Sequence, residues 1–269
     1  MNIAGIVLAG GQSSRMGQDK AKLTIEDHTL LSRAVNLLHA AGFEDCYVSG
    51  DYQGFNCIPD TQSELGPIAG IAACATQLSG LKQACPSIDN SAYSAPEYYA
   101  PKHYAPKNYV PKHSTSEHKV PEYNVAEHST PEWSTVEHCN TKQSKKYDAL
   151  FIMPVDMPLL AAEDCKKLLQ HFIKQFTNQS ITGKQGVYYK ETTFPMLLSL
   201  NDTLITYLND ALNSVHKKQR SLYRLIETLN IEGISQQQVD LFRFENTNTP
   251  EQWQRCLVTY NKMQTVKFK

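Results

Sequence analysis

No charge of either sign dominates this chain, because its 26 lysines and arginines are balanced by 27 aspartates and glutamates, for a formal net charge of -1. A protein without a net field has no global attraction to nucleic acid or to an anionic membrane. We therefore expect neither nucleic acid nor a membrane among its partners. Any anion that it binds has to be held by a local site.

Long apolar runs and export sequences are also missing. No stretch of about 18 apolar residues occurs, and the N-terminus has no basic segment followed by an apolar segment and a cleavage site. The seven cysteines are odd in number, widely spread and without a C-x-x-C pair, which argues against a disulfide framework and a zinc knuckle. We expect an unexported, cytoplasmic protein with reduced thiols.

The middle of the chain lacks the residues that build cores: positions 89–146 contain no Leu, Ile, Met, Phe or Gly. From 95 to 139 the sequence divides into nine five-residue units such as APEYY, APKHY and VPEYN, and the second position is usually proline. Frequent prolines interrupt helices and strand ladders, and so few aliphatic side chains cannot offset the entropy of ordering. We expect residues 85–146 to be a flexible, Pro-rich, low-complexity insertion. A tolerated expansion is favoured over a docking strip for a partner or a histidine-based metal site.

A long surface insertion is compatible with a single domain, because lengthening a loop from about 6 to about 60 residues costs only about 2 kcal/mol of closure free energy. We therefore expect residues 1–269 to form one domain that residues 85–146 interrupt. In the flanks, short apolar runs alternate with helical patterns, which is typical of an α/β fold with parallel strands and crossover helices. The expected strands are 3–8, 46–48, 55–58 and 149–153, and the expected helices are 30–41, 66–78 and 161–176.

The first expected strand leads into a loop that combines three glycines with two cations. These residues are Gly10, Gly11, Arg15, Gly17 and Lys20, within LAGGQSSRMGQDK. Glycines let backbone N–H groups approach anionic oxygens closely, and the two side chains add positive charge. The fingerprints G-x-x-x-x-G-K-[ST] and G-x-G-x-x-G are both absent. A structural turn would need only the adjacent glycines, so the cations favour a cradle for phosphate.

A second polar motif, PVDMP at 154–158, places Asp156 between two prolines just past the strand expected at 149–153. Ligands of parallel sheets bind at the carboxyl ends of the strands, so this motif and the opening loop are expected at one edge. Mg²⁺ is commonly held by one or two carboxylates together with substrate phosphates, which makes Asp156 a candidate metal ligand. On spacing alone, a turn residue or a cap for the following helix is an equally good interpretation.

Several motifs, in this order, resemble those of molybdenum cofactor guanylyltransferases. They are VLAGGQSSRMGQDK, CIPD at 57–60, GPIAG at 66–70, PVDMP, FP at 194–195, RSLYRL at 220–225 and FENTNTPEQW at 244–253. The resemblance covers nearly all of both flanks and none of residues 85–146. It implies a Rossmann-like nucleotidyltransferase, a three-layer sandwich with a mostly parallel sheet.

The resemblance also implies an activity: transfer of GMP from GTP to the terminal phosphate of molybdenum-molybdopterin, with Mg²⁺ as cofactor and pyrophosphate as the second product. Molybdenum-cofactor assembly proteins and acceptor molybdoenzymes would be its protein partners. Matched to the family's motifs, the catalytic residues would be Arg15, Lys20 and Asp156, with Asp156 also the metal ligand. The nucleotide site would comprise Leu8, Ala9, Gly10, Gly11, Lys20, Ser49, Asp60, Gly66 and Asp156. The pterin side would comprise Arg220, Asn246 and Asn248.

One position departs from the family's pattern: Ser49 stands where relatives can carry a nucleotide-contacting Asn, and a hydroxyl offers less than an amide. Other interpretations stay open. A cytidylyltransferase for the same pterin, or a sugar-phosphate nucleotidyltransferase, would share the superfamily's loop. The second glycine of LAGG and the segment GPIAG favour guanine. A non-catalytic cofactor-delivery module is the alternative from another class, and the set of Arg15, Lys20 and Asp156 argues against it.

Overall fold

The computed structural model describes residues 1–10, 16–60, 62–80, 146–177, 183–235 and 238–267. By their contacts, residues 1–83 and 143–269 belong to one compact unit. The expectations for the Pro-rich insertion lie outside the described residues, apart from Lys146 at its end. In the described part of the chain, no helix is both long and apolar enough to cross a membrane.

A seven-stranded sheet forms the centre of the described unit, in the order β5-β4-β1-β6-β8-β7-β9. Four of its six neighbouring pairs are parallel, and both antiparallel pairs involve β8. The strands are β1 (Ile3–Leu8), β4 (Cys46–Ser49), β5 (Cys57–Ile58), β6 (Ala149–Pro154), β7 (Gly186–Tyr189), β8 (Met196–Ser199) and β9 (Glu232–Ile234). The expected α/β fold with a mostly parallel sheet is therefore confirmed.

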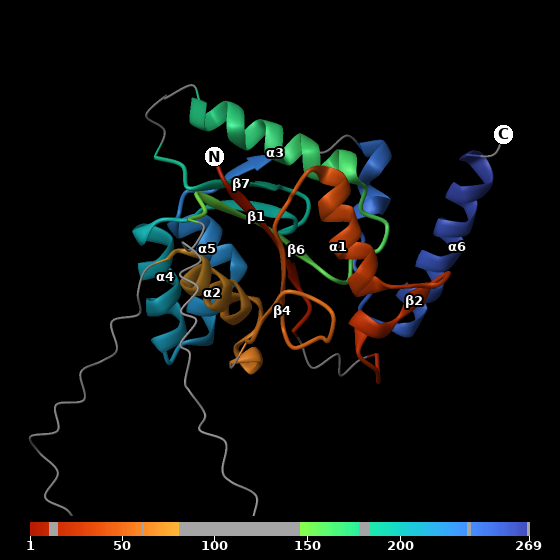
Figure 1. Cartoon of the computed structure of the whole chain (residues 1–269), viewed down its shortest axis with the longest axis horizontal. Helices are drawn as coiled ribbons and strands as arrows, with labels where there is room; N and C mark the ends of the chain where they lie inside the picture. Colours follow the sequence, from red (N-terminus) through yellow and green to blue (C-terminus); the bar gives the residue numbers. More distant parts are fainter. Residues whose placement is uncertain (11–15, 61, 81–145, 178–182, 236–237, 268–269) are drawn as a thin grey trace, which may run out of the picture. The chain divides into compact units, whose positions relative to one another are not determined.

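Helices cover both faces of this sheet (Figure 1). Helices α1 (Leu30–Ala41) and α3 (Ala162–Thr177) pack together on one face, and α2 (Pro67–Leu78) and α4 (Asp202–Asn213) pack together on the other. The shorter α5 (Leu222–Thr228) lies near α4 in Figure 1. Short elements complete the unit: the hairpin β2 (Thr24–Ile25) and β3 (His28–Thr29), and the 3-10 turns η1 (Lys20–Lys22), η2 (Ser63–Leu65), η4 (Lys217–Arg220) and η5 (Gln238–Phe244).

Helix α1 shows why the local sequence gives these elements. The Thr29 hydroxyl caps its first turn by accepting a hydrogen bond from Ser32 N at 3.1 Å. Gly42 ends it with φ +103°, a left-handed conformation that glycine adopts without strain. Between them, apolar side chains at helical spacing, including Leu31 and Leu38, are buried against the sheet.

Helix α2 approaches the sheet unusually closely because it is built from small residues. A methyl group on Gly70 would lie 2.6 Å from Ser49 Oγ and 3.2 Å from Leu8 Cδ2. Since atoms cannot sit that close, glycine is required here. The helix thereby covers the ends of β1 and β4, which are also the start of the polar loops.

The carboxyl ends of four strands fall in one row. Leu8, the last residue of β1, stands opposite both Ser49 at the end of β4 and Pro154 at the end of β6. Ser49 in turn stands opposite Ile58, the last residue of β5. This register aligns the loops that follow all four strands at one edge of the sheet.

The last helix, α6 (Pro250–Lys267), packs beside α1. The guanidinium of Arg33 lies over the ring of Tyr260, 4.9 Å from its centroid, and Trp253 is buried on the same helix. This contact brings the C-terminal part of the chain next to the edge at which β1 and β6 end.

Candidate active site at the carboxyl ends of the strands

Backbone hydrogen bonds tie the loops at this edge to one another. Ala9 N and Gly10 N both donate to Ser49 O, at 3.2 and 3.0 Å, and Val155 N donates to Leu8 O at 3.0 Å. Leu8 and Ala9 are buried, whereas Gly10 is exposed. Gly10 is thus the first residue after β1 whose backbone is open to a ligand.

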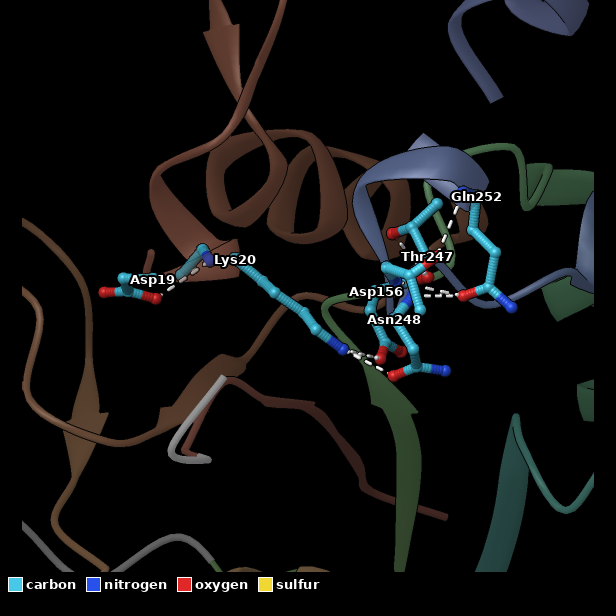
Figure 2. Close-up of polar contacts among 8 residues, drawn as sticks. Asp19, Lys20, Asp156, Thr247, Asn248 and Gln252 are labelled. Atoms are coloured by element: carbon cyan, nitrogen blue, oxygen red, sulfur yellow. Dashed lines mark hydrogen bonds and ion pairs between the residues drawn. The ribbon is translucent and has the colours of Figure 1, made fainter. Parts of the chain in front are cut away.

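Three side chains from distant parts of the sequence meet at the edge: Lys20, Asp156 and Asn248 (Figure 2). Lys20 Nζ lies 2.8 Å from Asp156 Oδ2 and donates to Asn248 Oδ1 at 2.5 Å. The side chains of Lys20 and Asp156 are only 14% and 17% exposed, so this ion pair is poorly screened by water. The carboxylate of Asp156 and the amide oxygen of Asn248 therefore both contact the ammonium group of Lys20, in a partly buried position.

Thr247 holds the main chain of Asp156 through two hydrogen bonds. The Thr247 backbone N–H donates to Asp156 O at 2.9 Å, and its hydroxyl donates to the same oxygen at 3.3 Å. Thr247 is 2% exposed, so these bonds lie in a place where losing them would be costly. The clamp joins the loop after β6 to the segment that precedes α6.

Asn248 is positioned by the first turn of α6, as Figure 2 shows. Gln252 Oε1 accepts from the backbone N–H groups of Asn248 and Thr249, at 2.7 and 3.1 Å. In return the Thr249 hydroxyl accepts from Gln252 N at 3.3 Å, and Pro250 opens the helix. This is a capping box, which satisfies the free N–H groups of a helix start reciprocally.

Lys20 begins the short turn η1, which its neighbour Asp19 caps. Asp19 Oδ1 accepts from Ala21 N at 3.0 Å. The hydroxyl of Tyr52 lies 3.1 Å from Ala9 O and 3.4 Å from the same Asp19 oxygen, and it can donate to either. Burial, and then the charge of Asp19, raises the pKa of Tyr52 to about 12, so the phenol keeps its proton at neutral pH.

Asp60 follows β5 and faces the loop after β1. A methyl group built on Gly10 would lie 3.7 Å from Asp60 Oδ2, which shows how close the carboxylate is to the exposed backbone. Its other oxygen accepts from Gln62 N at 3.0 Å. Burial raises the pKa of Asp60, the bond from Gln62 lowers it, and nearby Glu64 raises it further. Gly66, six residues later, precedes α2 as its N-cap residue with φ +83°.

Ser49 has an unexpected orientation. Its side chain is 1% exposed and faces α2, close to Gly70 and within hydrogen-bonding reach of the Cys74 thiol. What it presents to the site is its carbonyl oxygen, which holds Ala9 and Gly10. A direct contact of the Ser49 hydroxyl with a nucleotide stays a prediction, and the buried orientation does not favour it.

The remaining predicted residues differ in their placement. Asn246 is exposed, two residues before Asn248. Arg220 lies in η4, which contacts α4 and α5, and its guanidinium donates to Ser214 O at 2.5 Å. Among the described contacts no hydrogen bond joins Arg220 to either asparagine. Gly11 and Arg15 lie outside the described residues.

Three residues that position the site had not been singled out from the sequence: Tyr52, Thr247 and Gln252. The T-P-E-Q pattern of residues 249–252 is a recognisable capping box, so Gln252 was open to prediction. Thr247 and Tyr52 act through contacts between segments far apart in sequence, and no local pattern reports such contacts.

The oxygens present fit a hard divalent cation that is completed by phosphate. Asp156 Oδ2 and Asn248 Oδ1 converge on one cationic group, the ammonium of Lys20. Within the residues that the structure describes, no cluster of three or more His, Cys, Asp or Glu side chains could hold a metal by itself. One carboxylate and one amide oxygen are what a Mg²⁺ site needs when a polyphosphate supplies other ligands.

Comparisons with known proteins identify the family. Residues 5–229 match the family model described as the MobA-like NTP transferase domain. The chain is 28% identical over 253 residues to the molybdenum cofactor guanylyltransferase of Xanthomonas euvesicatoria pv. vesicatoria (strain 85-10), an alignment that covers 94% of this chain and 93% of that protein. The molybdenum cofactor guanylyltransferase of Rhodobacter capsulatus is 39% identical over 79 residues, which are 27% of this chain and 42% of that protein.

Solved structures share the fold. The molybdopterin-guanine dinucleotide biosynthesis protein A from Archaeoglobus fulgidus superposes with a TM-score of 0.54 at 14% identity, covering 97% of this chain and all of its own. A cytidylyltransferase from Leptospira borgpetersenii superposes with a TM-score of 0.51 at 10% identity, covering 94% of this chain and 82% of its own. The matching family model spans most of the sequence, and the chain therefore belongs to the MobA-like NTP transferase domain family as a nucleotidyltransferase of molybdenum cofactor biosynthesis.

Proposed function

We propose that this nucleotidyltransferase transfers GMP from GTP to the terminal phosphate of molybdenum-molybdopterin, giving the guanine dinucleotide form of the cofactor and pyrophosphate. The observation that carries the proposal is the meeting of Lys20, Asp156 and Asn248 at the sheet edge where the exposed Gly10 follows β1. The full-length similarity to a molybdenum cofactor guanylyltransferase supports the choice of substrates. A reaction that consumes GTP belongs with the nucleotide pool, so the proposal includes a cytoplasmic location.

Each residue has a defined task in the proposed reaction. A phosphate oxygen of the pterin attacks the α-phosphorus of GTP in line, and negative charge builds on the departing pyrophosphate. The attacking phosphate is already anionic, so no protein nucleophile is required. Lys20 neutralises charge on the phosphates, and the backbone from Ala9 to Gly10 holds the nucleotide, with Asp60 close by.

Asp156 and Asn248 would hold Mg²⁺ in this proposal. When bound, Mg²⁺ stabilises charge on the phosphate oxygens as a Lewis acid. Thr247 keeps the Asp156 main chain in place, and the capping box of α6 keeps Asn248 turned toward Lys20. Ser49 contributes in our proposal through its carbonyl oxygen. Asn246, an exposed residue two positions before Asn248, is assigned to the pterin in our proposal.

The decisive assay incubates the purified protein with Mg²⁺, molybdenum-molybdopterin and either GTP or CTP, and measures both pyrophosphate and the dinucleotide product. We expect turnover with GTP and little with CTP. Preferential use of CTP would make the protein a cytidylyltransferase, and absence of turnover with every triphosphate would favour a delivery module.

Asp156→Ala should lower kcat by roughly 10³-fold or more, because the site loses the carboxylate that we assign to the metal. The protein should still fold, since Asp156 is held in the structure by its main chain. The matched control is Asp148→Ala, because Asp148 precedes the same strand β6 at its opposite end and pairs with the N-terminus. Both variants are compared by steady-state kinetics and by circular dichroism. Full activity of Asp156→Ala would remove the residue from the mechanism.

A further inference from the structure

The Tyr52 hydroxyl is a hydrogen-bond donor to one residue before and one residue after the glycine-rich loop, and the two acceptor oxygens share its single proton. Tyr52 OH lies 3.1 Å from Ala9 O and 3.4 Å from Asp19 Oδ1. Ala9 follows β1 and carries the backbone assigned to the nucleotide, whereas Asp19 precedes Lys20. Along the chain, these two residues are connected through the loop. The hydrogen bonds of Tyr52 connect them more directly.

The ring of Tyr52 is fixed independently of its hydroxyl. Gly50 has φ +143°, and a methyl group on it would lie 2.8 Å from Tyr52 Cε2, so the ring lies directly against the glycine. Tyr52 N donates to Cys57 Sγ at 3.2 Å, and Cys57 Sγ donates back to Tyr52 O at the same distance. The position of the ring is thus set by the connection between β4 and β5. A phenylalanine at this position would keep the ring and lose only the hydroxyl.

Asp19 links the fixed Tyr52 ring to the turn that contains Lys20. The Asp19 oxygen that faces Tyr52 also accepts from Ala21 N, so it defines the first turn of η1, in which Lys20 lies. The Lys20 ammonium then reaches 2.8 Å from Asp156. The chain of contacts runs from β4 through Tyr52 and Asp19 to the ammonium group at the centre of the site.

We propose that Tyr52 is a positioning residue, which holds Ala9 and Asp19 at a fixed separation and thereby places Lys20 for the phosphates of the nucleotide. This inference rests on the proposed function, because the nucleotide is the ligand that the arrangement serves. Tyr52 does not take part in bond breaking, so its loss should weaken nucleotide binding more than it slows the chemical step.

The test compares Tyr52→Phe with Tyr47→Phe. Tyr47 lies in β4, and its hydroxyl makes a partly buried hydrogen bond to Tyr147 OH at 2.9 Å, away from the loops. Both variants lose one hydroxyl bond from the same region of the chain, so their melting temperatures should fall by similar amounts. Only Tyr52→Phe should raise the KM for GTP and the dissociation constant of Mg-GTP, by roughly fivefold, the value of one ordinary hydrogen bond. The KM for the pterin should change little in either variant.

A double-mutant cycle with Asp19→Ala tests the route of action. If Tyr52 acts through Asp19, Tyr52→Phe should weaken Mg-GTP binding less in the Asp19→Ala background than in the wild type. Equal effects of the two tyrosine variants on GTP, or fully independent effects in the cycle, would overturn the inference.

The wild-type protein separates this inference from the proposed function. If it prefers another triphosphate, the proposed nucleotide is wrong, and the comparison of Tyr52→Phe with Tyr47→Phe is made with that triphosphate. If it binds no triphosphate by isothermal titration calorimetry, both proposals fail. If it turns over GTP but Tyr52→Phe matches Tyr47→Phe, only the role of Tyr52 fails.

Discussion

At the scale of single residues, the central ion pair is better suited to binding than to stability. Lys20 and Asp156 are both largely removed from water, and the cost of dehydrating two charges cancels much of their attraction. What the pair does provide is a pre-assembled cation and anion. Under the proposed function, a magnesium-bound triphosphate would offer a metal to Asp156 and phosphate oxygens to Lys20 at the same time.

Asp60 yields a prediction about pH. Burial raises its pKa above the ordinary value of 3.8, so between that value and the raised one the folded protein holds more protons than the unfolded chain. Stability therefore falls as the pH rises through this window, and the loss persists at neutral pH. Asp60→Asn keeps an oxygen for the Gln62 N–H and has no charge to bury. We expect it to raise the melting temperature at pH 7.5, and the gain to shrink as the pH approaches 4.

Scanning calorimetry at several pH values checks this expectation, with the exposed Asp51→Asn as a control for a general change in net charge. The same Asp60→Asn protein should bind Mg-GTP more weakly if Asp60 belongs to the nucleotide site. A melting temperature at pH 7.5 below that of the wild type would show that the charged carboxylate stabilises the fold.

A site residue could be predicted from the sequence when a local pattern places it at the site, and not when packing between distant segments does. Lys20 and Asp156 are 136 positions apart, yet both follow strands that end at the same edge, and the sequence pattern is sufficient to place them together. Asn248 was expected on the pterin side from a motif, but its contact with Lys20 depends on where α6 packs. Tyr52 has no motif at all, since its hydroxyl acts between two loops.

At the scale of elements, α6 is the part that completes the site from outside the sheet. Asn248 lies just before its first turn, the capping residues Thr249 and Gln252 hold the Asn248 main chain, and Arg33 of α1 contacts a later turn through Tyr260. The helix thus connects the packed body of the protein to the side chain of Asn248.

Removing the cap should separate function from folding at this helix. Gln252→Ala leaves the N–H groups of Asn248 and Thr249 without their common acceptor, and we expect a loss of about 1 kcal/mol in the free energy of unfolding. Activity should fall by roughly tenfold, more than the lost stability explains, because Asn248 is no longer turned toward Lys20. Urea unfolding and kcat/KM measure the two effects. Thr259→Ala is the control, since the Thr259 hydroxyl donates to Arg255 O on the same helix. A fall in stability without a fall in activity would show that Asn248 does not depend on the cap.

The elements themselves were predictable where local patterns are strong. Apolar runs indicated β1 and β6, and helical spacing indicated α1. Strand β5 is shorter than expected, because Phe55 belongs to a turn in which its N–H donates to Tyr52 O. Strand β8 was not among the expected strands, and a buried four-residue run such as MLLS also carries no information about its antiparallel direction.

At the scale of the whole molecule, the sheet joins segments that lie on either side of the Pro-rich region. Strand β6 follows that region in the sequence and lies between β1, which precedes it, and β8. Every site residue assigned above comes from the flanks. We propose on this basis that the flanks form a single nucleotidyltransferase domain and that the region between them adds only length to one connection, from the end of α2 to the start of β6.

Deleting residues 89–142 tests that proposal. The truncated chain keeps the Asn2 bond to Lys146 O and closes a much shorter loop, which favours folding by about 2 kcal/mol or less, because closure entropy grows only logarithmically with length. We expect a melting temperature equal to or slightly above that of the full chain and a kcat/KM for GTP within about twofold of it.

A full-length variant with the residues 89–142 in shuffled order separates the effect of loop length from the effect of loop sequence. If the deletion protein folds by circular dichroism but no longer turns over GTP, and the shuffled variant is equally inactive, the pentapeptide units contribute directly to catalysis or substrate delivery. Retained activity in both would assign catalysis to the flanks alone.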